Sequence, residues 1–169
     1  MSPAKAMEQT VFKKLEPPRT EEGPELLIAG LGEFYTSETS GRMPAQWERF
    51  VRYIGSVPGR VGKATFGVLC KLDDAGHLEH DVKYIAGVEV SDLQEVPADW
   101  SRVHIPAHRY AVFTHRENVS TIRKTWSTIH RWLPKSGMKI ADAPQFERYG
   151  EAFDGATGDG GVEIWIPIL

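Results

Sequence analysis

One acidic residue stands in the most apolar stretch of the sequence. Alternation along residues 162–168 places valine and isoleucine side chains on one face and Glu163 and Trp165 on the other. Neither face is polar, which predicts a strand covered on both sides, where a carboxylate is costly unless it is paired, hydrogen-bonded or protonated. Two interpretations stay open. Glu163 is a buried acid that awaits a cationic or hydrogen-bond-donating ligand, or it lies at the sheet rim and pairs with an arginine such as Arg109 or Arg148.

Aromatic residues on other predicted elements could line the same space. The candidates beside Glu163 are Trp47, Tyr84, Tyr110, Phe113, Tyr149 and Trp165. Most aromatic residues at helical or strand spacing are simply core, and we assign Phe50 and Trp126 there. A tyrosine hydroxyl needs a partner when it is buried, which favours Tyr84, Tyr110 and Tyr149 as pocket residues.

The sequence gives little support for a metal site, a nucleotide-binding motif or a nucleophilic residue. His77, Glu79 and His80 follow a predicted turn without a known ligand spacing, so a solvated turn is favoured over a metal site. No phosphate loop, dinucleotide fingerprint, nucleophile elbow or paired-cysteine motif is present. Cys70 lies in an apolar strand and is interpreted as a structural thiol. We therefore predict no metal and no cofactor.

The elements that must position these residues recur in two similar sets. Apolar spacing predicts helices at 44–54, which includes Trp47, Phe50, Val51 and Ile54 on one face, and at 119–133, with Asn118 as its N-cap. Strands are predicted at 26–35, 66–72, 82–90, 103–115 with a bend near Pro106, 145–149 and 162–168, and residues 19–25 are expected to form a loop.

This order is β-α-β-β followed by β-α-β-β, and the stretches 82–88 and 162–168 share a pattern. The sequence therefore predicts an α+β fold: a tandem repeat with pseudo-two-fold symmetry, a mostly antiparallel sheet, helices on one face and a ligand cleft between the halves. We expect residues 1–8 to be disordered and residues 9–169 to form a single domain.

Composition narrows the function classes further. The 169 residues are 41% hydrophobic and 25% charged with a formal net charge of −3, which fits one domain and argues against general nucleic-acid binding. The single cysteine excludes an internal disulfide framework and fits a reducing compartment. Neither a signal peptide nor a membrane-spanning apolar run is evident, so a cytoplasmic location without membrane contact is expected.

An ordered set of motifs resembles the GyrI-like small-molecule-binding superfamily. This superfamily includes the effector-binding domains of AraC- and MerR-type multidrug regulators and the DNA gyrase inhibitory protein. The stretches that carry the resemblance are residues 43–50, 84–90, 105–116, 132–137, 146–149 and 163–168. The chain departs from the regulators because it shows no helix-turn-helix segment, and it resembles a free-standing member. The resemblance implies a glutamate, here Glu163, on the floor of an aromatic cleft.

The leading hypothesis is therefore a module that binds amphipathic, cationic small molecules, with a link to transcription regulation through the family. A cation gains from both the ring faces and the carboxylate. Two alternatives stay open: a hydrolase with Glu163 as general base, and a protein-binding inhibitor of a partner such as DNA gyrase. Direct nucleic-acid binding is not expected, whereas a homodimer or a separate protein partner stays open.

Overall fold

The strands of the computed structural model form one antiparallel sheet. The structure describes residues 15–36, 38–71 and 82–169. The eight strands follow the order β1-β6-β8-β7-β3-β4-β2-β5, and each neighbouring pair is antiparallel. Their bounds are β1 Arg19–Gly23, β2 Leu26–Tyr35, β3 Arg60–Lys71, β4 Val82–Val90, β5 Ser101–Ile105, β6 His108–His115, β7 Gln145–Tyr149 and β8 Val162–Pro167.

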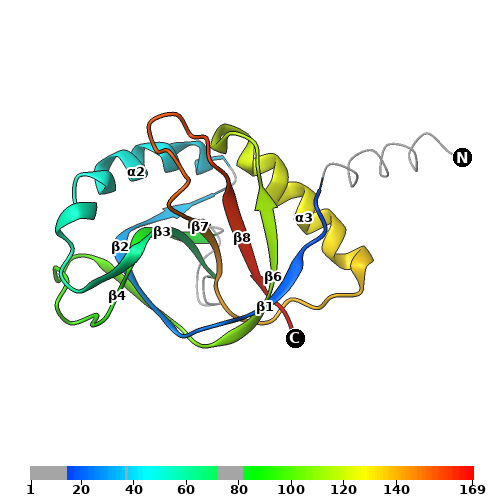
Figure 1. Ribbon diagram of the computed structural model, residues 1–169, viewed down its shortest axis with the longest axis horizontal. Coiled ribbons are helices and arrows are strands. Elements are labelled where there is room, and N and C mark those ends of the chain that lie inside the picture. Colours follow the sequence, from blue (N-terminus) through cyan, green and yellow to red (C-terminus); the bar gives the residue numbers. More distant parts are fainter. Residues whose placement is uncertain (1–14, 37, 72–81) are drawn as a thin grey trace, which may run out of the picture.

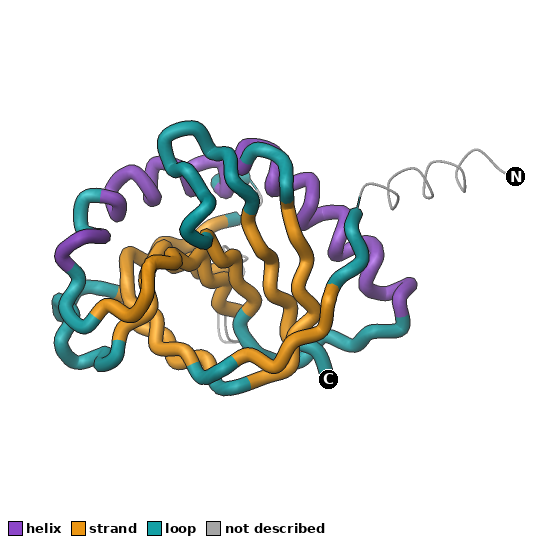
Figure 2. The backbone as a smooth tube through the Cα atoms, in the orientation of Figure 1, coloured by secondary structure: helices purple, strands orange, loops and turns teal. Residues whose placement is uncertain are grey.

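The sheet curls on itself, because the strands at the two ends of this order continue into strands within it (Figure 2). Strand β1 passes into β2 after Pro24 and Glu25, and β5 passes into β6 after Pro106 and Ala107. Because β1 pairs with β6 and β2 pairs with β5, the two bent strands form one ladder that closes the curl. Apolar side chains fill its inner face: Leu26, Ile28, Phe66, Val68, Ile85, Ile105, Tyr110, Val112, Phe146 and Trp165.

Helices α2 (Met43–Val51) and α3 (Ile122–Ser136) cover the outer face (Figure 1). Short 3-10 turns flank them: η1 (Ser40–Arg42), η2 (Ile54–Ser56) and η3 (Val119–Thr121). Phe50 of α2 and Ile129 of α3 are fully buried against two separate apolar clusters on this face. Within the described residues, neither helix has the length and apolar character needed to cross a membrane.

The predicted tandem repeat is confirmed, with each first strand divided in two by its bend. The first half runs from β1 to β4 around α2, and the second half runs from β5 to β8 around α3. The counterparts in the two halves are β1 and β5, β2 and β6, β3 and β7, and β4 and β8. When each strand in the strand order is replaced by its counterpart, the same order results, read from the other end. The fold therefore has a pseudo-two-fold axis, which passes through the central pair β3 and β7, where Gly67 lies opposite Glu147.

Local sequence signals account for the ends of the helices. Pro44 occupies the first turn of α2, where its missing N–H costs nothing. The Asn118 side chain accepts a hydrogen bond from the Ser120 backbone N–H and caps the turn that leads into α3, as predicted. Gly137 ends α3 in the left-handed conformation, with φ of 81°.

Two local predictions are wrong. Residues 19–23 form β1 rather than a loop. Their sequence has no apolar alternation because β1 is an edge strand, which pairs with β6 alone within the described part of the chain. Val51 was expected on the buried face of its helix but is 59% exposed, because α2 ends there and Gln46 occupies the buried position instead. The disorder expected for residues 1–8 and the turn around His77 lie outside the described residues.

Candidate functional site

Glu147 on β7 is the buried carboxylate of the outer face. Only 5% of the residue is exposed. Its Oε1 accepts hydrogen bonds from the hydroxyls of Tyr84 at 2.6 Å and Tyr149 at 2.8 Å, and its Oε2 accepts one from the Trp126 indole N–H at 2.8 Å. No lysine or arginine among the described residues forms an ion pair with it. The three hydrogen-bond donors to Glu147 are thus all neutral groups, and His115 is the charged group that also favours its ionised form.

Both helices reach this carboxylate through an indole. Trp126 of α3 donates to Glu147 directly, whereas Trp47 of α2 donates to the Tyr84 hydroxyl at 3.0 Å, which in turn donates to Glu147. Each tryptophan precedes the fully buried residue of its helix, Phe50 or Ile129, by three positions. The two indoles are therefore counterparts in the two halves, and the site lies where the halves meet.

A glycine makes room for the cluster. Gly67 of β3 faces Glu147 across the central strand pair. A Cβ at this position would lie 2.0 Å from the Tyr84 hydroxyl and 2.6 Å from Glu147 Oε1. These distances are far below van der Waals contact, so any larger residue at position 67 would push the tyrosine hydroxyl away from the carboxylate.

Burial dominates the electrostatics of the cluster. Desolvation raises the pKa of Glu147 above its ordinary value, and the hydrogen bonds from Tyr84, Trp126 and Tyr149 offset part of that rise. Desolvation also raises the pKa values of Tyr84 and Tyr149 well above the ordinary range, with the adjacent Glu147 charge adding to the effect. Both phenols are therefore fixed as hydrogen-bond donors to the carboxylate.

Aromatic rings close over the carboxylate from the helix side. Trp47 packs edge-on against Tyr149 with ring centroids 5.3 Å apart, and Phe153 packs against the same tyrosine at 4.8 Å. Phe153 belongs to the connection between β7 and β8, residues 150–161, which passes between α2 and α3 (Figure 1). Trp47 and Phe153 are only partly buried, so they form the outer wall of the site.

The structure does not show Glu163 as the expected buried, unpaired acid. Its side chain is 25% exposed and pairs with two arginines: Arg19, and Arg148 at 3.7 Å. Glu163 lies near the start of β8, at the rim of the inner face, where β1 supplies Arg19 and β7 supplies Arg148. The surroundings of Glu163 therefore fit the interpretation in which it pairs with an arginine at the sheet rim. Of the two arginines named for that interpretation, Arg148 is a partner.

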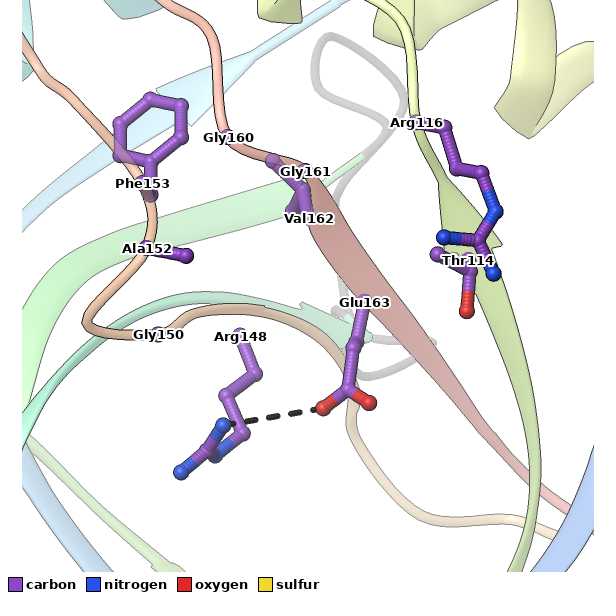
Figure 3. Close-up of a pocket in the computed structure, with 10 residues that line it drawn as sticks. All are labelled: Thr114, Arg116, Arg148, Gly150, Ala152, Phe153, Gly160, Gly161, Val162 and Glu163. Atoms are coloured by element: carbon purple, nitrogen blue, oxygen red, sulfur yellow. Dashed lines mark ion pairs between the residues drawn. The ribbon is translucent and has the colours of Figure 1, made fainter.

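Glu163 lines a cavity of about 270 Å³ (Figure 3). Arg148 points toward Glu163 from one side, and Thr114 and Arg116 lie on the other. The remaining wall comes from the connection between β7 and β8, including Phe153. The charged groups of this lining are already paired, since Glu163 pairs with Arg19 and Arg148 and Arg116 pairs with Glu16, so the lining holds no unpaired carboxylate for a cation among its described residues.

The predicted site residues divide between the two faces of the sheet. Trp47, Tyr84 and Tyr149 come together around Glu147 on the outer face. Tyr110 and Trp165 lie on the inner face with ring centroids 5.3 Å apart. Phe113 is fully buried under α3, where its ring packs edge-on against Trp132. The set predicted from the sequence is thus not one site.

Sequence reasoning missed the roles of Glu147 and Trp126. Trp126 was assigned to the core because it shares a helical face with apolar residues, yet its indole N–H reaches a carboxylate. The signal for Glu147 was the alternation in residues 145–149, which puts Glu147 and Tyr149 on one face and Phe146 on the other. Among the described residues, no three histidine, cysteine or acidic side chains cluster as a metal site would require.

Comparison with known proteins places this arrangement in context. The transcriptional regulator BrlR of Pseudomonas aeruginosa is 28% identical over 152 residues, which cover 89% of this chain and 54% of BrlR. This chain therefore spans about half the length of that relative. BrlR is a regulator by name, and the matched region is one part of it.

Solved structures share the fold at low sequence identity. SAV2435 bound to tetraphenylphosphonium has a TM-score of 0.71 at 16% identity, over 91% of this chain and 94% of that one. An integron cassette protein from the mobile metagenome of Vibrio cholerae has a TM-score of 0.67 at 16% identity, over 92% and 97% of the two chains. The EcmrR C-terminal domain has a TM-score of 0.64 at 16% identity, over 92% and 98%.

The family model that matches is the GyrI-like small molecule binding domain, and it covers residues 16–169. The match includes both halves of the repeat and the Glu147 cluster between them. The ordered motifs, the repeated strand order and the family model agree, and the chain belongs to the GyrI-like family of small-molecule-binding domains.

Proposed function

We propose that this protein binds lipophilic organic cations on the outer face of the sheet, with Glu147 as the carboxylate that faces the positive charge. One observation carries the proposal: Glu147 is buried and accepts three hydrogen bonds from neutral donors, with no basic ion-pair partner among the described residues. A cationic ligand would supply the missing counter-charge in a desolvated setting, where the attraction is strong.

The surrounding rings suit this class of ligand. Trp47, Tyr84, Trp126 and Tyr149 all lie within hydrogen-bond or ring-contact distance of one another or of Glu147. Aromatic faces attract cations, typically by about 0.5–2 kcal/mol each, and they accept planar molecules of many shapes. Few directional hydrogen bonds are required, so the proposed specificity is for charge and apolar surface rather than for one compound.

Access to the carboxylate requires a ring to move. Because Glu147 is only 5% exposed, a ligand must displace a part of the outer wall. Trp47, Trp126 and Phe153 are partly buried rings there, and among the described residues Trp47 donates its hydrogen bond to Tyr84 rather than to Glu147 itself. We therefore expect a ligand-dependent change in Trp47 fluorescence. SAV2435, which shares the fold, has been solved with tetraphenylphosphonium, a cation of this class, and this supports the proposal.

The test compares a cation with a neutral analogue of similar shape. Methyltriphenylphosphonium and triphenylphosphine oxide are titrated into the wild-type protein and into E147Q by isothermal calorimetry. Two opposite charges about 5 Å apart attract by roughly 3 kcal/mol at an effective dielectric constant of about 20, so E147Q should weaken phosphonium binding at least tenfold. Binding of the neutral oxide should change much less, because glutamine retains the shape of the side chain although its amide nitrogen cannot accept a hydrogen bond from Trp126 or the tyrosines.

E163Q provides the matched control, since it removes the same charge from the other face of the sheet. The sequence-based expectation that Glu163 selects cations is decided by the same titration. We expect E163Q to bind methyltriphenylphosphonium as the wild type does, because Arg19 and Arg148 already compensate the Glu163 charge. A selective loss with E163Q and none with E147Q would move the site to Glu163 and refute the proposal.

A further inference from the structure

A second cavity lies on the inner face of the curled sheet, on the side of β7 away from Glu147. Its volume is about 220 Å³. Phe66, Phe146 and Trp165 line it, and the rings of Phe146 and Trp165 stack with centroids 5.4 Å apart and an interplanar angle of 15°. Residues from both halves contribute, so this cavity also lies at the junction of the repeat.

One polar group in the lining has no partner. Tyr110 is 1% exposed, and its hydroxyl makes no hydrogen bond to any described residue. Buried hydroxyl groups are nearly always hydrogen-bonded, since leaving one unsatisfied costs about 1–3 kcal/mol. Burial raises the pKa of Tyr110 to about 12, so the group is a protonated donor. The cavity thus has an apolar wall and, buried within that wall, one hydroxyl group without a hydrogen-bond acceptor among the described residues.

Two cationic groups of the lining could pair with an anion. Lys63 and Arg148 contribute the positive charges and Glu89 contributes one negative charge, while Arg148 also pairs with Glu163 at 3.7 Å. Desolvation raises the pKa of Glu89, which weakens its preference for the charged form, although Arg148 acts in the opposite direction. The lining differs from the Glu147 cluster in that it holds cationic side chains.

We propose that the inner-face cavity is a second binding site, for small aromatic carboxylates of one or two rings. The ring would pack in the cavity against Phe66, Phe146 and Trp165, and the carboxylate would accept hydrogen bonds from Tyr110 and from Arg148 or Lys63. An apolar cavity of about 150 Å³ holds a benzene molecule, so about 220 Å³ has room for one substituted ring or a compact bicycle.

The test uses 2-naphthoate as the probe and 2-naphthalenemethanol as its neutral counterpart, both titrated by calorimetry. Saturable binding of 2-naphthoate is expected, at least fivefold tighter than that of the alcohol. Y110F removes only the hydroxyl and should weaken naphthoate binding at least threefold while the fold is as stable as the wild type or more so. K63Q alters an exposed side chain, and it should weaken naphthoate binding about twofold or more without affecting the fold.

The Glu147 site serves as the internal reference. E147Q should leave naphthoate affinity unchanged, and Y110F should leave methyltriphenylphosphonium affinity unchanged, because the two sites lie on opposite faces of β7. If phosphonium binding fails while naphthoate binding behaves as described, the proposed function fails and this site stands. Absence of saturable naphthoate binding at millimolar concentration, equal affinity for the alcohol, or loss of binding in E147Q would each overturn the second site.

Discussion

The carboxylate of Glu147 accepts its hydrogen bonds from uncharged groups. Two phenols and one indole donate to it, and each is held by packing against other rings. Such an arrangement satisfies the hydrogen-bonding capacity of the carboxylate without neutralising it, so part of the desolvation cost persists in the folded protein. A residue in this condition couples both stability and ligand affinity to its state of protonation.

The raised pKa of Glu147 predicts a specific dependence on pH. Its contribution to stability is fully present below the ordinary pKa of 4.5 and is lost as the pH rises through the higher folded value. The measurement is urea unfolding of the wild type and E147Q between about pH 4 and about pH 8. Over this range the unfolding free energy of the wild type should fall relative to that of E147Q by about 1.4 kcal/mol for each unit by which the pKa is raised. Phosphonium affinity should change in the opposite direction and fall as the pH is lowered through the same value. Parallel stability profiles for the two proteins would contradict the assignment.

Sequence periodicity predicts most of the helices and strands. The strands at residues 26–35, 82–90 and 145–149 match the structure, and the bend at Pro106 appears as the break between β5 and β6. Periodicity places Glu147 on the face of Tyr149 but could not show that this face is buried, because the neighbours Phe146 and Arg148 give the opposite face a mixed character. The burial of Glu147 is created by β3 alongside and by both helices above, all distant in sequence. The apolar surroundings of Glu163 were misleading for the converse reason, since its position at the rim depends on how the sheet curls.

The central strand pair supplies a sharp test of how the elements position the site. G67A places a methyl group where the Tyr84 hydroxyl and Glu147 Oε1 now lie, so we expect a loss of about 1–3 kcal/mol in unfolding free energy and weaker phosphonium binding. G55A is the matched control, because a Cβ there meets no atom within 4 Å among the described residues. Urea denaturation and calorimetry measure both effects. Equal behaviour of G67A and G55A would show that the close approach at Gly67 has no consequence.

At the scale of the whole molecule, the two halves share their hydrogen-bonded ladders. Strand β3 pairs with β7, β1 with β6, and β2 with β5, and each of these pairs joins one half to the other. The inner core likewise draws on both halves, with Phe66 packing against Phe146 and Tyr110 against Trp165. Neither half has a complete core of its own.

We therefore expect neither half to fold as a monomer. Peptides of residues 15–100 and 101–169, studied separately by circular dichroism, should show no cooperative thermal transition. An equimolar mixture should regain one, because the shared ladders and the inner core are restored when the halves meet. A cooperative transition from either peptide in a monomeric state, confirmed by sedimentation, would disprove this dependence.

Glu147 lies at the pseudo-two-fold axis, where a fully symmetric protein could not carry a single glutamate. A homodimer of identical half-chains would carry the same residue on both sides of the axis, where Gly67 and Glu147 now face each other. Two glutamates would bring like charges into buried contact, and two glycines would leave no charge at all. Joining the halves in one polypeptide removes that constraint, because each copy can then mutate alone. The single buried charge at Glu147 is thus a product of broken symmetry, which the joining of two diverged repeats in one chain permits.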